Sequence, residues 1–592
     1  MNPLGDRRMQ RQFMGYWGIP GQTEPHSSPT KILAKITPNI RQGEHWGVGD
    51  IGDIGDIGEK CTNTIEPDKK IVAAISASGF VNRPDAWVRI EGDRLILGRE
   101  PFGRVPLYWA KVEDIIWFAS KFQLLLSILE TRNVSIPALY GYAAFSYLPT
   151  PLTPVTDIFV VPAGMERVFI LDGKSGAIAE ELLPRNCWQE MPQQIDDEKE
   201  AIAQLQTLLK NSIHRQIADL PSEPVGVFLS GGLDSSTVAA LLVEAGVKVR
   251  AYTLEFGEKY APEWPYAEQV ANFLNIPLVK VPATPRQIKK ALVKTVAALD
   301  LPFGDGVTVP LYLLAEVASQ ETAVIFNGEG GDQLFAGWTN KPMITASIYN
   351  QEHPGGKQNF IGNYLRTFHR LLGYEARVFQ PEVYARVQQI SPEDWLKDAL
   401  DRESCKELLH RLRRATLMLK GAQNIHPRAT NLAFANGLVV RSPFCDLPLA
   451  QWTFQLSGEL CLRGSCEKYI LKKAVESWLP PEIVWREKRG MKVPLTQWCL
   501  NELWPDIRHW LNPGSLQSEG RFMPDIVKQL ICGTLGGQIR GRRIGEILWL
   551  LLIWQVWRTT VLGEAKMGQS IYHNLWLPPT WLRQLDSWQN GE

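Results

Sequence analysis

The residues with the clearest chemical potential lie at 225–242, where an apolar run meets a polar turn and the chain then becomes apolar again. Residues 225–229 have the composition of a buried parallel strand. The turn reads Ser230-Gly231-Gly232-Leu233-Asp234-Ser235-Ser236. Glycines permit a sharp turn, and either serine at its end can cap a helix that begins at Thr237.

A strand, a loop of small residues and a helix N-terminus form an anion site, because backbone N–H groups point outward and the helix dipole favours negative charge. A strand–helix turn without a ligand is the alternative, but glycines, serines and an acid together favour a phosphate cradle. Neither Gly-x-x-x-x-Gly-Lys-Ser/Thr nor Gly-x-Gly-x-x-Gly occurs here. Asp234 can lie beside phosphates only with a cation between them, which predicts Mg²⁺.

A second turn, Asn327-Gly328-Glu329-Gly330-Gly331-Asp332, follows the apolar residues 323–326. We expect Asp332 to face Asp234 as a second Mg²⁺ carboxylate, which leaves Glu329 for acid–base work or for orienting the nucleophile. A glycine-rich turn with solvated acids is the alternative.

A third segment at 482–495 reads EIVWREKRGMKVPL and concentrates basic residues between Arg486 and Lys492. A solvated basic face is the ordinary explanation. Beside an ATP site, however, such a cation can neutralise charge that builds up in a transition state, and Lys488 and Arg489 are the candidates.

The chain around these turns alternates predicted strands at 225–229, 247–256, 273–281 and 321–326 with helical patterns, of which 198–220 is one. That order predicts an α/β fold with a doubly wound parallel sheet and a ligand at the carboxyl ends of its strands. Residues before about 185 are β-rich, with apolar runs at 71–80, 94–99 and 115–120. A polar, proline-containing linker at 184–200 divides the predicted domains, 1–190 and 191–592.

The overall composition argues against several classes of protein. The 592 residues carry a net charge of +0, which argues against nucleic-acid and polybasic membrane partners. The most apolar stretch, Ile547–Trp554, is short of the roughly 20 residues that span a bilayer and predicts a buried helix. Scattered cysteines and the lack of a visible signal peptide favour a cytoplasmic protein without disulfides or zinc. The repeat GDIGDIGDIGEK at 49–60 predicts a flexible surface loop.

The motifs together resemble the glutamine-dependent asparagine synthetases over nearly the whole chain. The similar blocks occur in family order: FLSGGLDSS, YTLEF, LPFGDGVTVPLYLL, FNGEGGDQLFAGW, GLVVRSPFCDLPLAQW and KYILKKAVESWLPPEIVWREKRGMKVPL. The resemblance implies an N-terminal Ntn-hydrolase-like β-sandwich and a C-terminal ATP pyrophosphatase domain with a helical extension.

The resemblance also implies roles and cofactors, ATP and Mg²⁺. A carboxylate, small or peptidic, is adenylated, pyrophosphate leaves, an amine attacks and AMP is released. Lys488 stabilises the adenylation transition state and Glu329 lies near the substrate. The pyrophosphate is held by Ser230, Gly231, Gly232, Leu233, Asp234, Ser235 and Ser236, the AMP by Leu229, Leu254, Asn327 and Gly328, and Mg²⁺ by Asp234 and Asp332.

The N-terminal region departs from the family pattern. In MGYWGIPG at 14–21, Gly15 stands where the family has its nucleophilic cysteine, and glycine has no nucleophile. The family's glutamine-binding blocks are also missing. These departures predict an inactive glutaminase half, so the amine comes from free ammonia, a partner protein or the substrate itself. Gln333 and Val439 depart from the usual glutamates and leave the aspartate pocket open to question.

Three functions therefore compete. The first is an amide synthetase acting on aspartate. The second applies the same chemistry to a peptide or amino-acid derivative, as in lasso-peptide macrolactam cyclases and β-lactam synthetases. The third is a nucleotide-binding pseudoenzyme scaffold, which is disfavoured because unpaired buried acids such as Asp234 and Asp332 are costly. A further pyrophosphatase function, tRNA thiolation, has no catalytic cysteine pair to support it.

Overall fold

The computed structural model describes most of the chain. The described residues are 14–18, 70–75, 84–172, 177–184, 188–192, 194–220, 224–257, 264–337, 343–344, 360–487, 490–491, 493–535, 542–564 and 578–581. The predictions for the repeat at 49–60 and for Lys488 and Arg489 fall outside this part of the chain.

The N-terminal region contains two antiparallel sheets. One has the order β1 (Met14–Gly18), β6 (Ile115–Ala119), β5 (Tyr108–Val112), β7 (Phe159–Val160), and the other β2 (Lys70–Ile75), β3 (Ala86–Glu91), β4 (Arg94–Arg99), β8 (Met165–Leu171), β9 (Ile178–Pro184). The sheets touch where Trp109 of β5 meets Phe169 of β8, with ring centroids 5.0 Å apart. The β-rich reading of this region therefore matches the structure, while its assignment as an Ntn-hydrolase-like sandwich stays a prediction.

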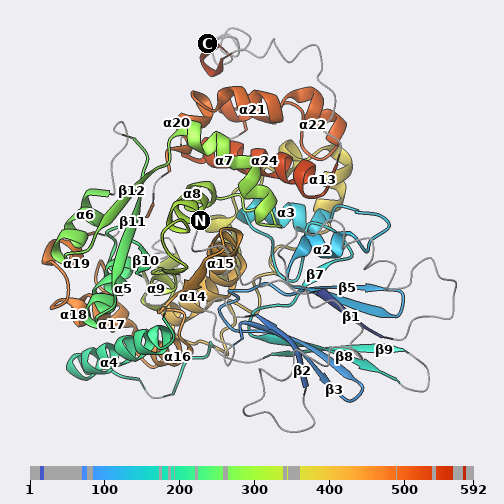
Figure 1. Ribbon diagram of the computed structural model, residues 1–592. Helices are drawn as coiled ribbons and strands as arrows, with labels where there is room; N and C mark the ends of the chain where they lie inside the picture. The colour runs from blue at the N-terminus through green and yellow to red at the C-terminus, as the bar shows by residue number, and fades with distance from the viewer. Residues whose placement is uncertain are drawn as a thin grey trace, which may run out of the picture.

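The second region is built on a parallel sheet. Its strand order is β12 (Leu278–Pro282), β11 (Val249–Glu255), β10 (Val225–Phe228), β13 (Val324–Phe326), β14 (Val439–Arg441), and every neighbouring pair is parallel. The first four strands were predicted from the sequence; β14 was not. Helices α5 (Leu233–Glu244) and α6 (Trp264–Phe273) lie on one side and α8 (Thr308–Ala318) and α15 (His426–Ala435) on the other (Figure 1).

The order of these strands fixes where a ligand can bind. The chain runs outward from β10 through β11 to β12 and then returns to place β13 on the other side of β10. Such a reversal leaves a crevice at the carboxyl ends of the two central strands. Both glycine-rich turns begin there, one after β10 and the other after β13.

Helices surround the sheet and fill the C-terminal part. They are α4 (Glu198–Ile217), α7 (Pro285–Ala298), α9 (Gly331–Leu334), α11 (Phe360–Phe368), α12 (Glu375–Val378), α13 (Pro381–Val387), α14 (Leu408–Thr416), the π-helix η3 (Leu417–Ile425), α16 (Leu447–Thr453), α17 (Gly458–Cys461), α18 (Tyr469–Val475), α19 (Pro481–Val484), α20 (Leu495–Leu500), α21 (Trp504–Trp510), α22 (Pro513–Glu519) and α23 (Ile526–Cys532). A two-stranded hairpin, β15 (Leu462–Arg463) and β16 (Cys466–Glu467), precedes α18.

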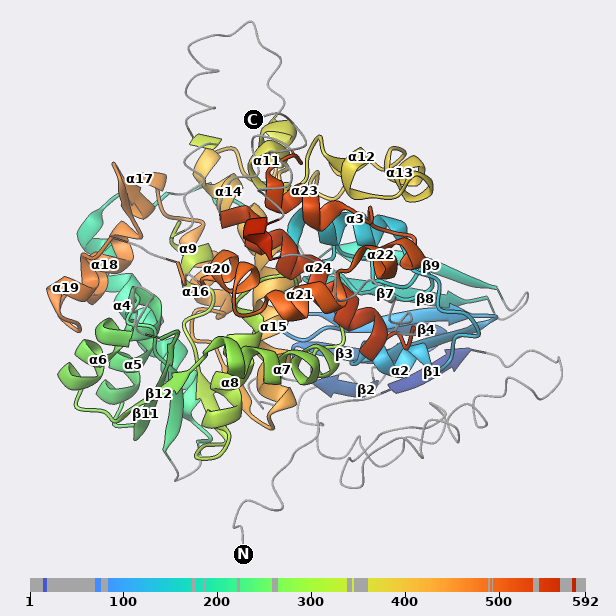
Figure 2. The same cartoon turned by 90° about the horizontal axis from the view of Figure 1, so that it is seen from above.

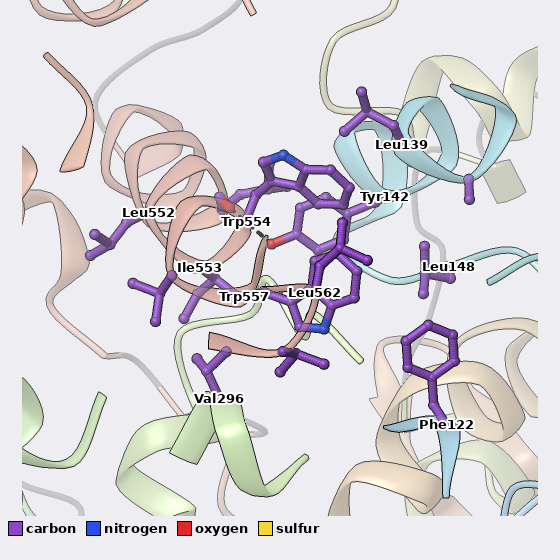
Figure 3. Close-up of a cluster of buried hydrophobic side chains, with 14 of the residues drawn as sticks. Phe122, Leu139, Tyr142, Leu148, Val296, Leu552, Ile553, Trp554, Trp557 and Leu562 are labelled. Carbon is purple, nitrogen blue, oxygen red and sulfur yellow. Dashed lines mark hydrogen bonds between the residues drawn. The ribbon is translucent and has the colours of Figure 1, made fainter. Parts of the chain in front are cut away.

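The long apolar helix predicted near the C-terminus is α24 (Arg542–Thr560), which lies at the centre of a buried cluster (Figure 3). Trp554 and Trp557 are fully buried there. Tyr142 of α3 (Ile136–Phe145) donates its hydroxyl to the carbonyl of Leu550 at 2.8 Å. Figure 2 shows α3, a helix of the N-terminal half, beside α24. Within the described chain, no helix combines the length and apolar character needed to cross a bilayer.

A loop of the N-terminal region also packs against helices of the second region. The Nδ1 of His426 donates to the carbonyl of Phe102 at 2.8 Å. A Cβ added to Gly103 would lie only 2.8 Å from the carbonyl oxygen of Ala422, so the backbones approach closely. The ends of η3 and α15 are thereby held by the first region.

The space beside Gly15 in β1 is filled from the neighbouring strand β6. Gly15 pairs with Phe118, and a Cβ at Gly15 would lie 2.6 Å from Cζ of that ring. We expect Gly15→Ala to cost on the order of 1–3 kcal/mol by overpacking and to lower the midpoint of thermal unfolding. Adding Phe118→Leu should recover part of this loss. Equal midpoints for Gly15→Ala and the unmodified protein would contradict the packing.

Candidate active site

The first glycine-rich turn forms a compact loop between β10 and α5. Helix α5 begins at Leu233 with Gly232 as its N-cap, so the predicted start at Thr237 was wrong. The reason is that Ser235 does not cap a later helix: its Oγ donates back to the carbonyl of Gly232 at 3.2 Å, inside the first helical turn. Asp234 and Ser236 consequently lie in that first turn.

Hydrogen bonds within the loop fix its shape. The backbone N–H of Gly232 donates to Oγ of Ser230, and that of Ser230 donates to Oγ of Ser235, both at 3.2 Å. Gly231 has a φ of +69°, and a Cβ there would lie 2.5 Å from backbone atoms of Tyr266 and Ala267. Only glycine fits this position, because the conformation and the space both exclude a side chain.

The second turn is organised by the side chain of Asn327. Its Oδ1 accepts from Oγ of Ser442 at 2.8 Å and from the N–H of Glu329 at 3.2 Å. Its own N–H donates to the carbonyl of Arg441 at 3.0 Å, at the end of β14. Gly330 has a φ of +104° and reverses the chain before α9. Asn327 thus positions the loop that carries Glu329 and Asp332.

The two turns come into backbone contact because glycines face the partner loop. A Cβ at Gly328 would lie 2.7 Å from the backbone nitrogen of Ser235. A Cβ at Gly331 would lie 2.5 Å from Cγ of Asp234. The glycines therefore allow the two carboxylates, Asp234 and Asp332, to approach the same point.

The ammonium of Lys468 occupies that point. Its Nζ lies 2.6 Å from Oδ1 of Asp234 and 2.5 Å from Oδ1 of Asp332. The lysine is buried and has a left-handed backbone with a φ of 56°, which costs on the order of 1 kcal/mol for a residue with a Cβ. Burial lowers its pKa, but Asp234 and then Asp332 outweigh burial and raise the pKa well above its usual value. The predicted approach of the two acids is therefore present, with a lysine between them.

Glu329 lies beside this charged cluster and is partly exposed to the cavity. Burial raises the pKa of its carboxyl to about 7, and the negative charges of Asp332 and Asp234 add to the effect although Arg428 opposes it. A carboxyl with a pKa near 7 can gain or lose a proton at physiological pH, which suits a general acid or base.

The loops enclose one end of a cavity of about 300 Å³. Every predicted site residue lines it except Ser236, whose hydroxyl is buried beneath the loop, and Lys488, which lies outside the described chain. The cavity therefore collects Leu229, Ser230, Gly231, Gly232, Leu233, Asp234, Ser235, Leu254, Asn327, Gly328, Glu329 and Asp332.

The lining of the cavity combines two kinds of residue. The glycine-rich loops and their carboxylates are polar, whereas a second group is apolar: Phe228, Tyr252, Leu254, Phe256, Leu311, Leu314 and Leu432. An apolar pocket joined to an anion cradle has the division that a nucleotide requires, with the base in one part and the phosphates in the other.

Three basic residues that also line the cavity were not predicted as site residues: Lys468, Lys472 and Arg486. The first two belong to the block KYILKKAVESWL, which was noted as a motif without a role. Only the fold brings Lys468 to Asp234, since the two residues are 234 positions apart in the chain.

The fold and the site define an α/β protein with a parallel sheet and a cavity where the carboxyl ends of its two central strands meet the glycine-rich turns. The family model described as asparagine synthase matches residues 204–559. The asparagine synthetase 1 (glutamine-hydrolyzing) of Bacillus subtilis is 24% identical over 507 residues, which cover 82% of this chain and 78% of that protein. A putative asparagine synthetase (glutamine-hydrolyzing) of Mycobacterium tuberculosis is 25% identical over 80% of this chain and 76% of its own length.

The chain belongs to the asparagine synthase family and is a carbon–nitrogen ligase. Among solved structures, an NH3-dependent NAD synthetase from Campylobacter jejuni aligns with 36% of this chain and 96% of its own at 15% identity. The TM-score of that structure is 0.19.

The raised pKa of Glu329 predicts how stability depends on pH. The folded protein holds this proton more tightly than the unfolded chain, so the protein loses stability as the pH rises from about 4.5 to about 7 and no more above that. Glutamine has no such proton. We expect the midpoint of thermal unfolding of Glu329→Gln, relative to the unmodified protein, to rise across this interval and then level off. A difference that stays constant from pH 4.5 to pH 8 would contradict the assignment.

Proposed function

We propose that this protein is an ATP-dependent, AMP-forming amide synthetase that adenylates a carboxylate for attack by an amine. The observation that carries the proposal is the convergence of Asp234, Asp332 and Lys468 at the polar end of a nucleotide-sized cavity. Membership of the asparagine synthase family supports the amide product. Aspartate is the first carboxylate to test, because the relatives are named asparagine synthetases.

In the adenylation step a carboxylate oxygen of the substrate attacks the α-phosphorus of ATP. The bond from that phosphorus to the bridging oxygen breaks, and pyrophosphate leaves with the electron pair. The ammonium of Lys468 and the N-terminus of α5 are placed to offset the negative charge of the phosphates.

The carboxylates also fit a magnesium ion. Two hard oxygen ligands on adjacent loops, open to a cavity that accepts phosphates, match the preference of Mg²⁺ for one or two carboxylates plus phosphate oxygens. Asp234 and Asp332 would hold the ion, which neutralises phosphate charge when bound. The ammonium of Lys468 lies between the same two side chains, so the ion and the lysine would share these carboxylates.

In the second step the amine attacks the acyl carbon, and AMP leaves with the electron pair of the acyl–oxygen bond. The attacking nitrogen must lose a proton to become an amide. Glu329 can accept it, since its pKa of about 7 leaves much of the carboxylate ionised at neutral pH.

The amine does not come from glutamine hydrolysis by this chain. Gly15 offers no nucleophile, and the ring of Phe118 fills the space beside it, 2.6 Å from where a Cβ would stand. Free ammonia, a partner protein or an amino group of the substrate itself supplies the nitrogen. We expect no measurable glutamate release from glutamine by the purified protein. Glutamate release at a rate matching ATP use would overturn this part of the proposal.

The test of the synthetase activity is ATP–pyrophosphate exchange with Mg²⁺ and aspartate, with and without ammonia. Aspartate-dependent exchange, followed by asparagine formation from ammonia, is the expected result. Exchange that requires another carboxylate, such as a peptide, would change the substrate and keep the chemistry. No exchange with any carboxylate, together with no ATP binding, would contradict the proposal.

The role of Asp332 gives a sharper test of the same reaction. We expect Asp332→Asn to lower the exchange rate by roughly 100-fold or more, because the change removes one of two negative charges that hold the cation beside the phosphates. Asp394→Asn is the matched control, since Asp394 pairs with Lys397 on the surface and lines no part of the cavity. Full exchange by Asp332→Asn would show that this carboxylate does not hold the metal.

A further inference from the structure

Arg486 lines the cavity together with Lys468 and Lys472, and it follows α19 (Pro481–Val484) in the chain. The carbon at the centre of its guanidinium lies 3.8 Å from the centroid of the Tyr266 ring. Tyr266 belongs to α6, and its backbone lies 2.5 Å from the position of a Cβ at Gly231. The same tyrosine therefore contacts the phosphate loop with its backbone and carries the arginine on its ring.

The guanidinium of Arg486 is not fully used by the protein. Its Nη1 is buried and has no hydrogen-bond partner in the described part of the chain. A buried donor without a partner is costly, and one that lines a ligand cavity is typically satisfied by the ligand. The backbone of Arg486 is held by α18, because Nζ of Lys472 donates to the carbonyl of Arg486 at 3.4 Å.

We propose that Arg486, held on the ring of Tyr266, is a phosphate-binding residue that recognises the β- and γ-phosphates of ATP and the departing pyrophosphate. The inference rests on the proposed function, because it places the triphosphate at the loop of Ser230–Ser235. A guanidinium presents donors in a planar fork that matches two phosphate oxygens, whereas a lysine offers a point charge. Stacking on the tyrosine ring holds the fork in place without neutralising its charge.

If Arg486 binds the β- and γ-phosphates, its loss should affect pyrophosphate and AMP differently. Pyrophosphate contains the groups that Arg486 binds, and AMP does not. Loss of the guanidinium should therefore weaken pyrophosphate and ATP but spare AMP, whose base and sugar occupy the apolar end of the cavity. A residue that merely supported the fold would affect both ligands alike.

The experiment is titration calorimetry of the full chain with magnesium pyrophosphate and, separately, with AMP. We expect Arg486→Gln to weaken pyrophosphate binding by at least about tenfold while AMP affinity stays within about twofold. Arg486→Lys, which keeps the charge and loses the fork, should fall between Arg486→Gln and the unmodified protein. Lys473→Gln is the matched control, since Lys473 pairs with Glu476 and does not line the cavity.

A variant of Tyr266 tests whether the ring under Arg486 contributes to phosphate binding. Tyr266→Leu removes the ring and leaves Arg486 in place, so it should weaken pyrophosphate binding in the same direction with a smaller effect. Unchanged pyrophosphate affinity in Arg486→Gln, or equal losses for pyrophosphate and AMP, would overturn the inference while leaving the proposed function intact. An unmodified protein that binds neither ligand would overturn both.

Discussion

The ion pairs of Lys468 with Asp234 and Asp332 are the constraint on which the rest of the site depends. A buried ammonium and two carboxylates are stable together only when each is paired, because removing one partner leaves uncompensated charge in a region of low dielectric. The geometry of this cluster accounts for features that otherwise look unrelated. It explains why Gly328 and Gly331 face Asp234 and Ser235, and why Lys468 adopts a left-handed backbone.

The arrangement of strands and helices brings Lys468, Asp234 and Asp332 together. Parallel strands β10 and β13 are neighbours, so the loops after them emerge side by side at one edge of the sheet. The β15–β16 hairpin and α18 bring Lys468 over that edge from far along the chain. The N-terminal region packs against the helices of the second region. Phe102 and Gly103 contact η3 and the start of α15, and the hydroxyl of Tyr142 is hydrogen-bonded to the backbone of α24. These contacts give the N-terminal region a structural role in supporting the second region.

Local patterns in the sequence predicted the parts of the site that are local. Both glycine-rich turns, the strands before them and the acids within them can be read from consecutive residues, as can α24 from its apolar run. Strand β14 was missed because its three residues, Val439–Arg441, are too short to show a pattern. The start of α5 was misplaced because serines can cap a helix or bond within it, and only the fold decides. Lys468 was given no role, and Arg486 was noted only as part of a basic segment, because their significance depends on contacts with residues more than 200 positions away.

The central claim is that the pair Asp234–Asp332 binds the metal of an ATP complex, and the most direct test is nucleotide binding to the unmodified protein. Titration with the non-hydrolysable analogue α,β-methylene-ATP, in excess Mg²⁺ and then in excess EDTA, measures the metal dependence without requiring a carboxylate substrate. The account predicts binding at least about tenfold tighter with Mg²⁺, because the ion links the two carboxylates to the phosphates. Equal affinity in both conditions would contradict it and would leave the ammonium of Lys468 as the cation that pairs Asp234 with Asp332.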